Sequence, residues 1–117
     1  MKYSIRIVER KCNKKGYIPV FEENVQDVLV HFLMSEVLNF SNEICNVLSK
    51  AIENKNKNLG FAGNAIELMI ENGIASLDYQ LDEMMLDEPL KLPVEELNEL
   101  VLKWISDVKE LKAKETK

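Results

Sequence analysis

Apolar and polar residues alternate near the start of the chain, as they do in half-buried strands. In YSIRIVER, residues 3–10, Tyr3, Ile5 and Ile7 share one side. YIPVF, residues 17–21, can return beside it after a turn with Asn13 and Gly16, and Pro19 would confine it to a sheet edge. The pattern predicts an N-terminal pair of strands.

A hairpin turning at Asn72-Gly73 is the sharpest expectation, because both positions of this favoured turn take positive φ. One side of the ribbon would hold three apolar pairs: Ile70–Ala75, Leu68–Leu77 and Ile66–Tyr79. The other side would hold Glu71–Ile74, Met69–Ser76 and Glu67–Asp78. A slip of one residue would mix the two sets, so the separation supports this register. DEMMLDE, residues 82–88, is then a loop, and PLKL, residues 89–92, a short strand.

Helical spacing of apolar residues covers two further stretches. In the first, Asn24 is expected to cap a helix with Asp27 in its first turn. Ser41 could cap a second helix, so the pattern leaves open whether residues 25–54 form one helix or two. In the last stretch, Pro93 fits the first turn, and the apolar stripe is Val94, Leu97, Val101, Trp104, Val108 and Leu111.

These elements predict a single α+β domain over residues 1–117. We expect a small antiparallel sheet with a central hairpin, packed by a long helix or two from the N-terminal half and by a C-terminal helix. Residues 112–117 are expected to be a frayed polar tail. No stretch resembles a signal peptide or a membrane span, which predicts a cytoplasmic protein without a membrane partner.

Charge is distributed unevenly around a net value of −5. Residues 1–20 hold six bases and one acid, whereas residues 61–100 hold ten acids and only Lys91 as a base. The acidic block would repel phosphate, which argues against nucleic acid as its partner, and would attract a basic protein. Glu67 opposite Asp78 costs stability on the order of 0.2–1 kcal/mol. Binding, rather than stability, would explain that pair.

Residues with catalytic or metal-binding potential form no recognisable motif, so we expect no enzyme, cofactor or metal site. His31 lies in an apolar helix without a Cys or Asp at ligand spacing, which favours a structural histidine. Cys12 and Cys45 belong to no CxxC motif, so both are expected to be reduced, with Cys45 buried. GFAGN lacks the Lys and Ser/Thr of a phosphate loop.

Two kinds of apolar side chain need interpretation. Met69, Met84 and Met85 could fill the core or lie on an adaptable binding surface, and we take the core as the default. Trp104 is expected to anchor the core against the sheet.

The C-terminal half resembles bacterial immunity proteins of polymorphic toxin systems, including those of contact-dependent growth inhibition. The resemblance covers roughly residues 60–108, under half of the chain. It consists of Gly63-Asn64 entering a strand, a tight hairpin, a short strand, and a helix that starts PVEEL and runs from Leu100 to Trp104. The N-terminal half contributes no such signature.

The resemblance implies a small antitoxin that binds and neutralises a cognate toxin domain, commonly a nuclease. Such a protein would need no cofactor and would be a monomer or a weak dimer. Its candidate toxin-binding residues are Glu67, Glu71, Asp78, Tyr79, Asp82, Glu83, Met84, Asp87 and Glu88. Tyr79, Met84, Met85 and Leu86 are the candidate buried anchors. The alternative is an acidic chaperone or adaptor that holds an unfolded segment of a secreted effector.

Overall fold

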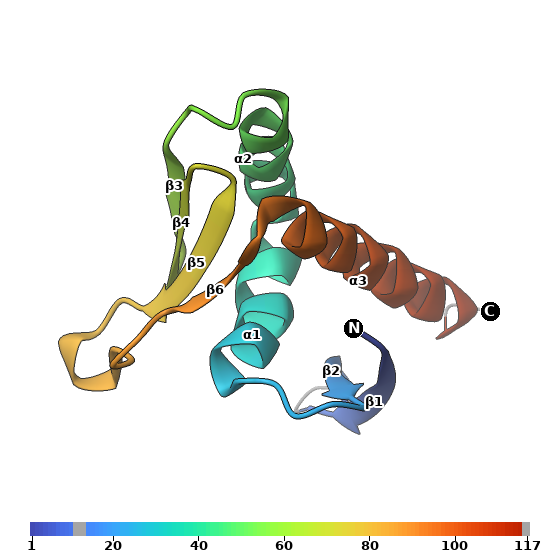
Figure 1. Cartoon of the computed structure of the whole chain (residues 1–117). Helices are drawn as coiled ribbons and strands as arrows, with labels where there is room; N and C mark the ends of the chain where they lie inside the picture. The colour runs from blue at the N-terminus through green and yellow to red at the C-terminus, as the bar shows by residue number, and fades with distance from the viewer. Residues whose placement is uncertain (11–13, 116–117) are drawn as a thin grey trace.

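The computed structural model describes residues 1–10 and 14–115, which form a mixed α+β structure with two antiparallel sheets. β1 (Tyr3–Glu9) and β2 (Lys15–Phe21) form a two-stranded ribbon. β3 (Leu59–Ala62), β4 (Ile66–Glu71), β5 (Ile74–Tyr79) and β6 (Leu90–Pro93) form a four-stranded sheet in that order. In Figure 1 the helices all lie to one side of the four-stranded sheet, and the ribbon lies below α3 (Val94–Glu115).

The N-terminal strands pair with each other as expected, but they form a sheet of their own. Pro19 is opposite Ile5 in a ribbon where both strands are edges, so its missing N–H breaks no ladder to a third strand. Tyr17 is buried, and Tyr3 packs edge-on against Trp104 at 5.7 Å between ring centroids. The ribbon is therefore attached through aromatic side chains rather than through backbone pairing. Cys12 and Asn13, part of the expected turn, lie outside the described residues.

The central hairpin is confirmed with the predicted register. β4 and β5 pair Ile66 with Tyr79, Leu68 with Leu77 and Ile70 with Ala75, and the charged side pairs as expected. Asn72 and Gly73 have φ of 50° and 78°, the positive values that this turn requires. β6 confirms the short strand expected at PLKL.

β3 was not predicted, and it completes the sheet beside β4. Leu59 lies opposite Ile70 and Phe61 opposite Leu68, so the two apolar residues of this short strand join the side that faces the core. The strand was missed because its apolar–polar alternation extends over only four residues and follows a polar run.

Residues 25–54 form two helical segments rather than one long helix. α1 (Asp27–His31) continues into a π-helical segment, η2 (Phe32–Val37), and α2 (Ser41–Glu53) follows. The break is at Phe40, which has φ −129° and ψ 38°, outside the helical range. The expected caps are wrong: the residue before α1 is Gln26 rather than Asn24, and Ser41 is the first residue of α2. Asp27 does lie in the first turn.

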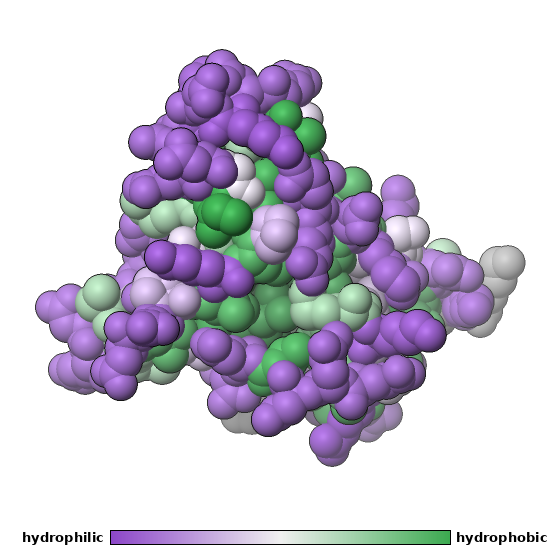
Figure 2. All heavy atoms as spheres, viewed as in Figure 1, coloured by the Kyte–Doolittle hydropathy of each residue, from purple (hydrophilic) through white to green (hydrophobic). Residues whose placement is uncertain are grey.

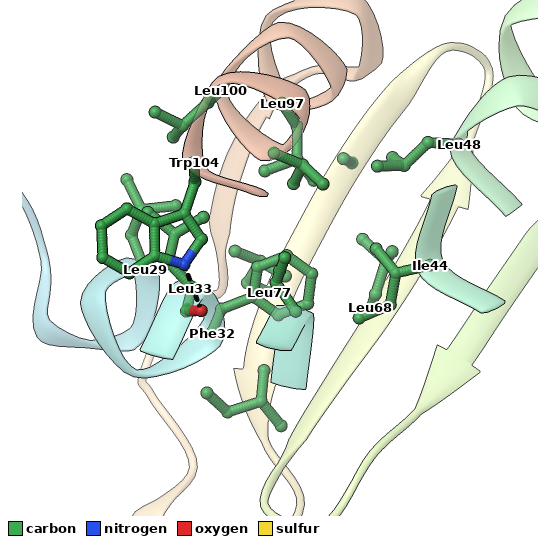
Figure 3. Close-up of a cluster of buried hydrophobic side chains, with 14 of the residues drawn as sticks. Leu29, Phe32, Leu33, Ile44, Leu48, Leu68, Leu77, Leu97, Leu100 and Trp104 are labelled. Atoms are coloured by element: carbon green, nitrogen blue, oxygen red, sulfur yellow. Dashed lines mark hydrogen bonds between the residues drawn. The ribbon is translucent and has the colours of Figure 1, made fainter. Parts of the chain in front are cut away.

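The core fills the space between the inner side of the four-stranded sheet and the helices (Figure 3). Trp104 is fully buried, as expected, and its indole Nε1–H donates to the Leu33 carbonyl at 2.7 Å. This bond ties α3 to η2, and it satisfies a carbonyl in the segment where the helical hydrogen bonding changes. The predicted stripe of α3 is buried from Val94 to Val108.

α3 begins at Val94 and continues to Glu115, so Pro93 is the last residue of β6 and not, as expected, part of the first helical turn. Of the polar tail expected over 112–117, residues 112–115 are the end of this helix, and the rest lies outside the described residues. Among the helices that the structure describes, none has both the length and the apolar composition needed to cross a membrane.

Candidate functional site

The side of the four-stranded sheet that faces away from the helices is open to solvent. We call it the outer face, and the register places ten residues on it: Gly60, Ala62, Glu67, Met69, Glu71, Ile74, Ser76, Asp78, Lys91 and Pro93. Only Ser76 and Asp78 among them are half-buried, and the others are exposed. Because the helices cover only the inner side, this face remains available to a partner.

Carboxylates outnumber cations on the outer face and in the segment that follows it. Glu67, Glu71 and Asp78 share the face with a single cation, Lys91. We call residues 80–89 the acidic loop; it adds Asp82, Glu83, Asp87 and Glu88 and no base. None of these seven acids forms an ion pair with a cation within residues 1–10 and 14–115. Six of them are exposed, and Asp78 is half-buried.

A shallow concavity of about 360 Å³ lies where the outer face meets the acidic loop. Its lining combines carboxylates, a hydroxyl, an amide and thioethers: Glu67, Met69, Ser76, Asp78, Tyr79, Gln80, Asp82, Met85 and Pro89. Four of the nine candidate residues are brought together here, namely Glu67, Asp78, Tyr79 and Asp82. Glu71, Glu83, Met84, Asp87 and Glu88 lie outside the concavity.

Asp78 has a structural task as well as a charge. Its Oδ1 accepts the backbone N–H of Leu86 at 2.9 Å and that of Tyr79 at 2.8 Å. The first of these bonds spans the acidic loop and fixes its far end beside β5. The like-charge pair with Glu67 is thus explained in part by loop closure, which needs an acceptor at this position.

Exposed apolar side chains gather in the same region. Nine large apolar side chains are exposed within the described residues, and five of them lie on the outer face or the acidic loop: Met69, Ile74, Leu81, Met84 and Met85. Met69 is 43% exposed and Met85 is 54% exposed, so the expectation that the methionines fill the core is wrong. Figure 2 shows hydrophilic and hydrophobic residues intermixed on the loop at the lower left. Such a mixture is typical of a binding surface.

Tyr79 is placed differently from the other candidates. It pairs with Ile66 on the inner side of the sheet, and only 8% of it is exposed. Its hydroxyl shares a 2.8 Å hydrogen bond with His31 Nδ1, and burial together with the charge of Asp27 raises the pKa of its phenol. Tyr79 can line the floor of the concavity, but it cannot act as a projecting anchor. Leu86 is also partly buried against the core.

His31 and Cys45 are the remaining residues with chemical potential, and both are partly engaged in packing or hydrogen bonding. His31 is exposed at the end of α1, and its bond to Tyr79 joins that helix to β5. Cys45 is free and half-buried rather than fully buried, and burial raises the pKa of its thiol. In residues 1–10 and 14–115 no group of three His, Cys, Asp or Glu side chains is arranged to hold a metal ion.

The outer face and the acidic loop therefore present carboxylates beside exposed thioethers. Sequence reasoning found these acids but missed Met69, Ser76, Gln80 and Pro89 as lining residues. Met69 could have been found, because the predicted register already placed it on the charged side. Comparison with known proteins adds no assignment: the chain matches no family model, no curated protein and no solved structure.

Proposed function

We propose that this protein is a cytoplasmic immunity protein that binds and neutralises a basic toxin domain, such as a nuclease, through the outer face and the acidic loop. The observation that carries the proposal is that seven carboxylates, which form no ion pair within the described residues, lie on the outer face and acidic loop together with five exposed apolar side chains. A merely solvated face needs charge, but it does not need exposed Met and Leu beside that charge.

Charge and apolar contact would contribute differently to this binding. The carboxylates would steer a cationic domain toward the face and raise the association rate, an effect that falls with ionic strength. Met69, Met84 and Met85 would provide the apolar contact that slows dissociation, because the flexible thioether adapts to an uneven partner. A nuclease is a suitable target, since a surface that grips phosphate is itself cationic and can be covered by an acidic protein.

The alternative, an acidic chaperone or adaptor, draws on the same exposed apolar residues. A chaperone would hold an unfolded segment of an effector, and the concavity of about 360 Å³ would accept its side chains. The two functions differ in their ligand: the immunity protein recognises a folded cationic domain, whereas the chaperone recognises an extended chain.

Glu67→Lys tests the proposal because it reverses one charge at the centre of the surface. The proposal predicts an effector gene beside this one that encodes a basic C-terminal domain, and that domain is the partner in the test. The substitution is predicted to hold or raise the melting temperature, since the new ammonium group would face Asp78 across the strand pair. At low salt it should weaken binding of the folded domain about tenfold, a cost of about 1.4 kcal/mol.

Glu99→Lys is the matched control, because Glu99 is exposed on α3 away from the outer face and its substitution makes the same change in net charge. It should leave the affinity within about twofold. Equal affinity of the Glu67→Lys variant and the wild type would contradict the proposal, as would the absence of any basic effector domain. Binding of the unfolded domain alone would favour the chaperone.

A further inference from the structure

A second concavity, of about 560 Å³, lies on a different part of the molecule and has the opposite charge. We call it the basic cleft. It is formed by the end of the β1–β2 ribbon, by η2 with its flanking residues, and by the end of α3. Its lining residues are Arg10, Lys14, Lys15, Gly16, Tyr17, His31, Met34, Ser35, Leu38, Asn39 and Lys112.

Four cations converge on this cleft, and none of its described lining residues is a carboxylate. Lys15 begins β2, and Arg10 and Lys14 lie just outside the ends of β1 and β2, whereas Lys112 lies near the end of α3. Arg10, Lys14 and Lys112 form no ion pair with any acid in the part of the chain that the structure describes. All four cationic side chains are exposed, and gathering like charges around a concave surface opposes folding, so a bound anion would relieve that repulsion.

The fold holds two of these cations against neighbouring groups. Arg10 lies over Gly16, where an added Cβ would be 2.9 Å from the Arg10 Nε atom. Lys112 Nζ lies 5.9 Å from the centre of the buried Tyr17 ring, a cation–π distance. Side chains positioned in this way lose less freedom on binding than fully solvated lysines do.

The rest of the lining offers a place for an organic group. Met34 and Leu38 are half-buried apolar residues on one wall, and Ser35 and Asn39 lie beside them as polar groups. The His31 ring uses Nδ1 for Tyr79, which leaves Nε2 for another contact. A volume of about 560 Å³ lies within the roughly 300–1,000 Å³ typical of small-ligand sites.

We propose that the basic cleft binds a phosphorylated small molecule of nucleotide size. Two or more phosphoryl groups would contact Arg10, Lys14 and Lys112, because Arg donates in a fork that matches phosphate oxygens and Lys adds point charge. The organic part would rest against Met34 and Leu38. This site is independent of the outer face, whose acids would repel the same ligand.

Isothermal titration of the full chain with adenosine triphosphate, pyrophosphate and inorganic phosphate tests the proposal at low salt. The triphosphate is expected to bind more tightly than pyrophosphate, and inorganic phosphate most weakly. Lys112→Glu is expected to reduce triphosphate affinity at least about tenfold. Lys109→Glu is the matched control, because Lys109 is exposed on the same helix outside the cleft. It should reduce affinity less than about twofold.

Thermal unfolding of both variants shows whether they fold, and Lys14→Glu provides a second variant from another element if Lys112→Glu does not. No heat with any of the three ligands at millimolar concentration would overturn the proposal. Equal weakening by Lys112→Glu and Lys109→Glu would also overturn it, since the attraction would then be diffuse. Tight binding of a single-stranded oligonucleotide without binding of the triphosphate would replace it with a nucleic-acid surface.

Discussion

At the scale of single residues, Asp78 shows how one carboxylate can hold a loop and contribute charge to a surface. Its Oδ1 accepts two backbone N–H groups, and the bond to Leu86 spans the acidic loop. The side chain is half-buried, so part of the carboxylate still faces the concavity. The repulsion from Glu67 is therefore the cost of placing a strong acceptor at this position.

Substitution of Asp78 separates these two roles. Asp78→Ala leaves the Leu86 N–H without its acceptor and is expected to cost about 1 kcal/mol of unfolding free energy. Asp78→Asn keeps a carbonyl acceptor and removes the charge opposite Glu67, so its cost should be less than half as large. Urea denaturation measures both values. Equal losses in the two variants would show that the charge, and not the hydrogen bond, determines stability here.

The environment of the Tyr3 hydroxyl leads us to expect that the folded protein loses stability at alkaline pH. Its hydroxyl donates to Asp107 Oδ2 at 2.6 Å, and burial, together with this bond, raises the pKa of the phenol well above its ordinary value of 10.0. A raised pKa in the folded state means that this stability is fully present below the pKa of the unfolded chain and is lost as pH rises toward the folded value.

Tyr3→Phe removes this contribution, so the stability difference between wild type and variant should be constant at neutral pH and shrink as pH rises above about 10. Urea denaturation at a series of pH values from about 7 to about 11 provides the measurement, with Tyr79 present in both proteins as a common background. A difference that stays constant across the series would mean that the hydroxyl does not titrate differently in the folded protein.

At the scale of elements, the hairpin is the part that sequence predicts best, because its information is local. Asn72-Gly73 determines the turn, and the alternation determines which side is buried. The same register places Met69 on the charged side with Ser76, and Tyr79 on the apolar side with Ile66. Applied to every residue of the hairpin, this register predicts that Met69 is exposed beside the acids and that Tyr79 is buried.

The helical half is predicted less well, because its geometry depends on distant contacts. The break at Phe40 accompanies a tilted contact between the rings of Phe40 and Phe61, 5.4 Å apart, with Phe61 in the strand that was missed. The separation of the ribbon from the main sheet likewise depends on Tyr3 meeting Trp104. The basic cleft brings Arg10 and Lys112 together, which no local pattern in either segment indicates.

Gly63 and Glu36 form a tertiary contact of this kind that can be measured. Glu36 lies in η2 and is fully buried, and a Cβ added at Gly63 would collide with its Oε2. Gly63→Ala is therefore expected to cost about 1–3 kcal/mol. In a Glu36→Ala background the same substitution should cost at least about 1 kcal/mol less, because the colliding carboxylate is gone. Equal costs in the two backgrounds, from urea denaturation, would show that the contact is absent.

At the scale of the whole molecule, the two signs of charge lie on different surfaces. The outer face and acidic loop carry seven acids and one lysine, whereas the described lining of the basic cleft contains four cations and no acid. This separation makes the two proposals independent, because a cationic domain would bind the acidic outer face and a polyphosphate would bind the basic cleft. The net charge of −5 hides this arrangement, whereas the uneven charge of the two halves of the sequence already indicates it.

Amide hydrogen exchange of this protein alone and in complex with the neighbouring effector's C-terminal domain tests the central claim most directly. The account predicts that the complex slows exchange in the acidic loop and in β4 and β5, with the ribbon and the end of α3 unchanged. Slower exchange confined to the ribbon, η2 and the end of α3, with the acidic loop unaffected, would contradict it.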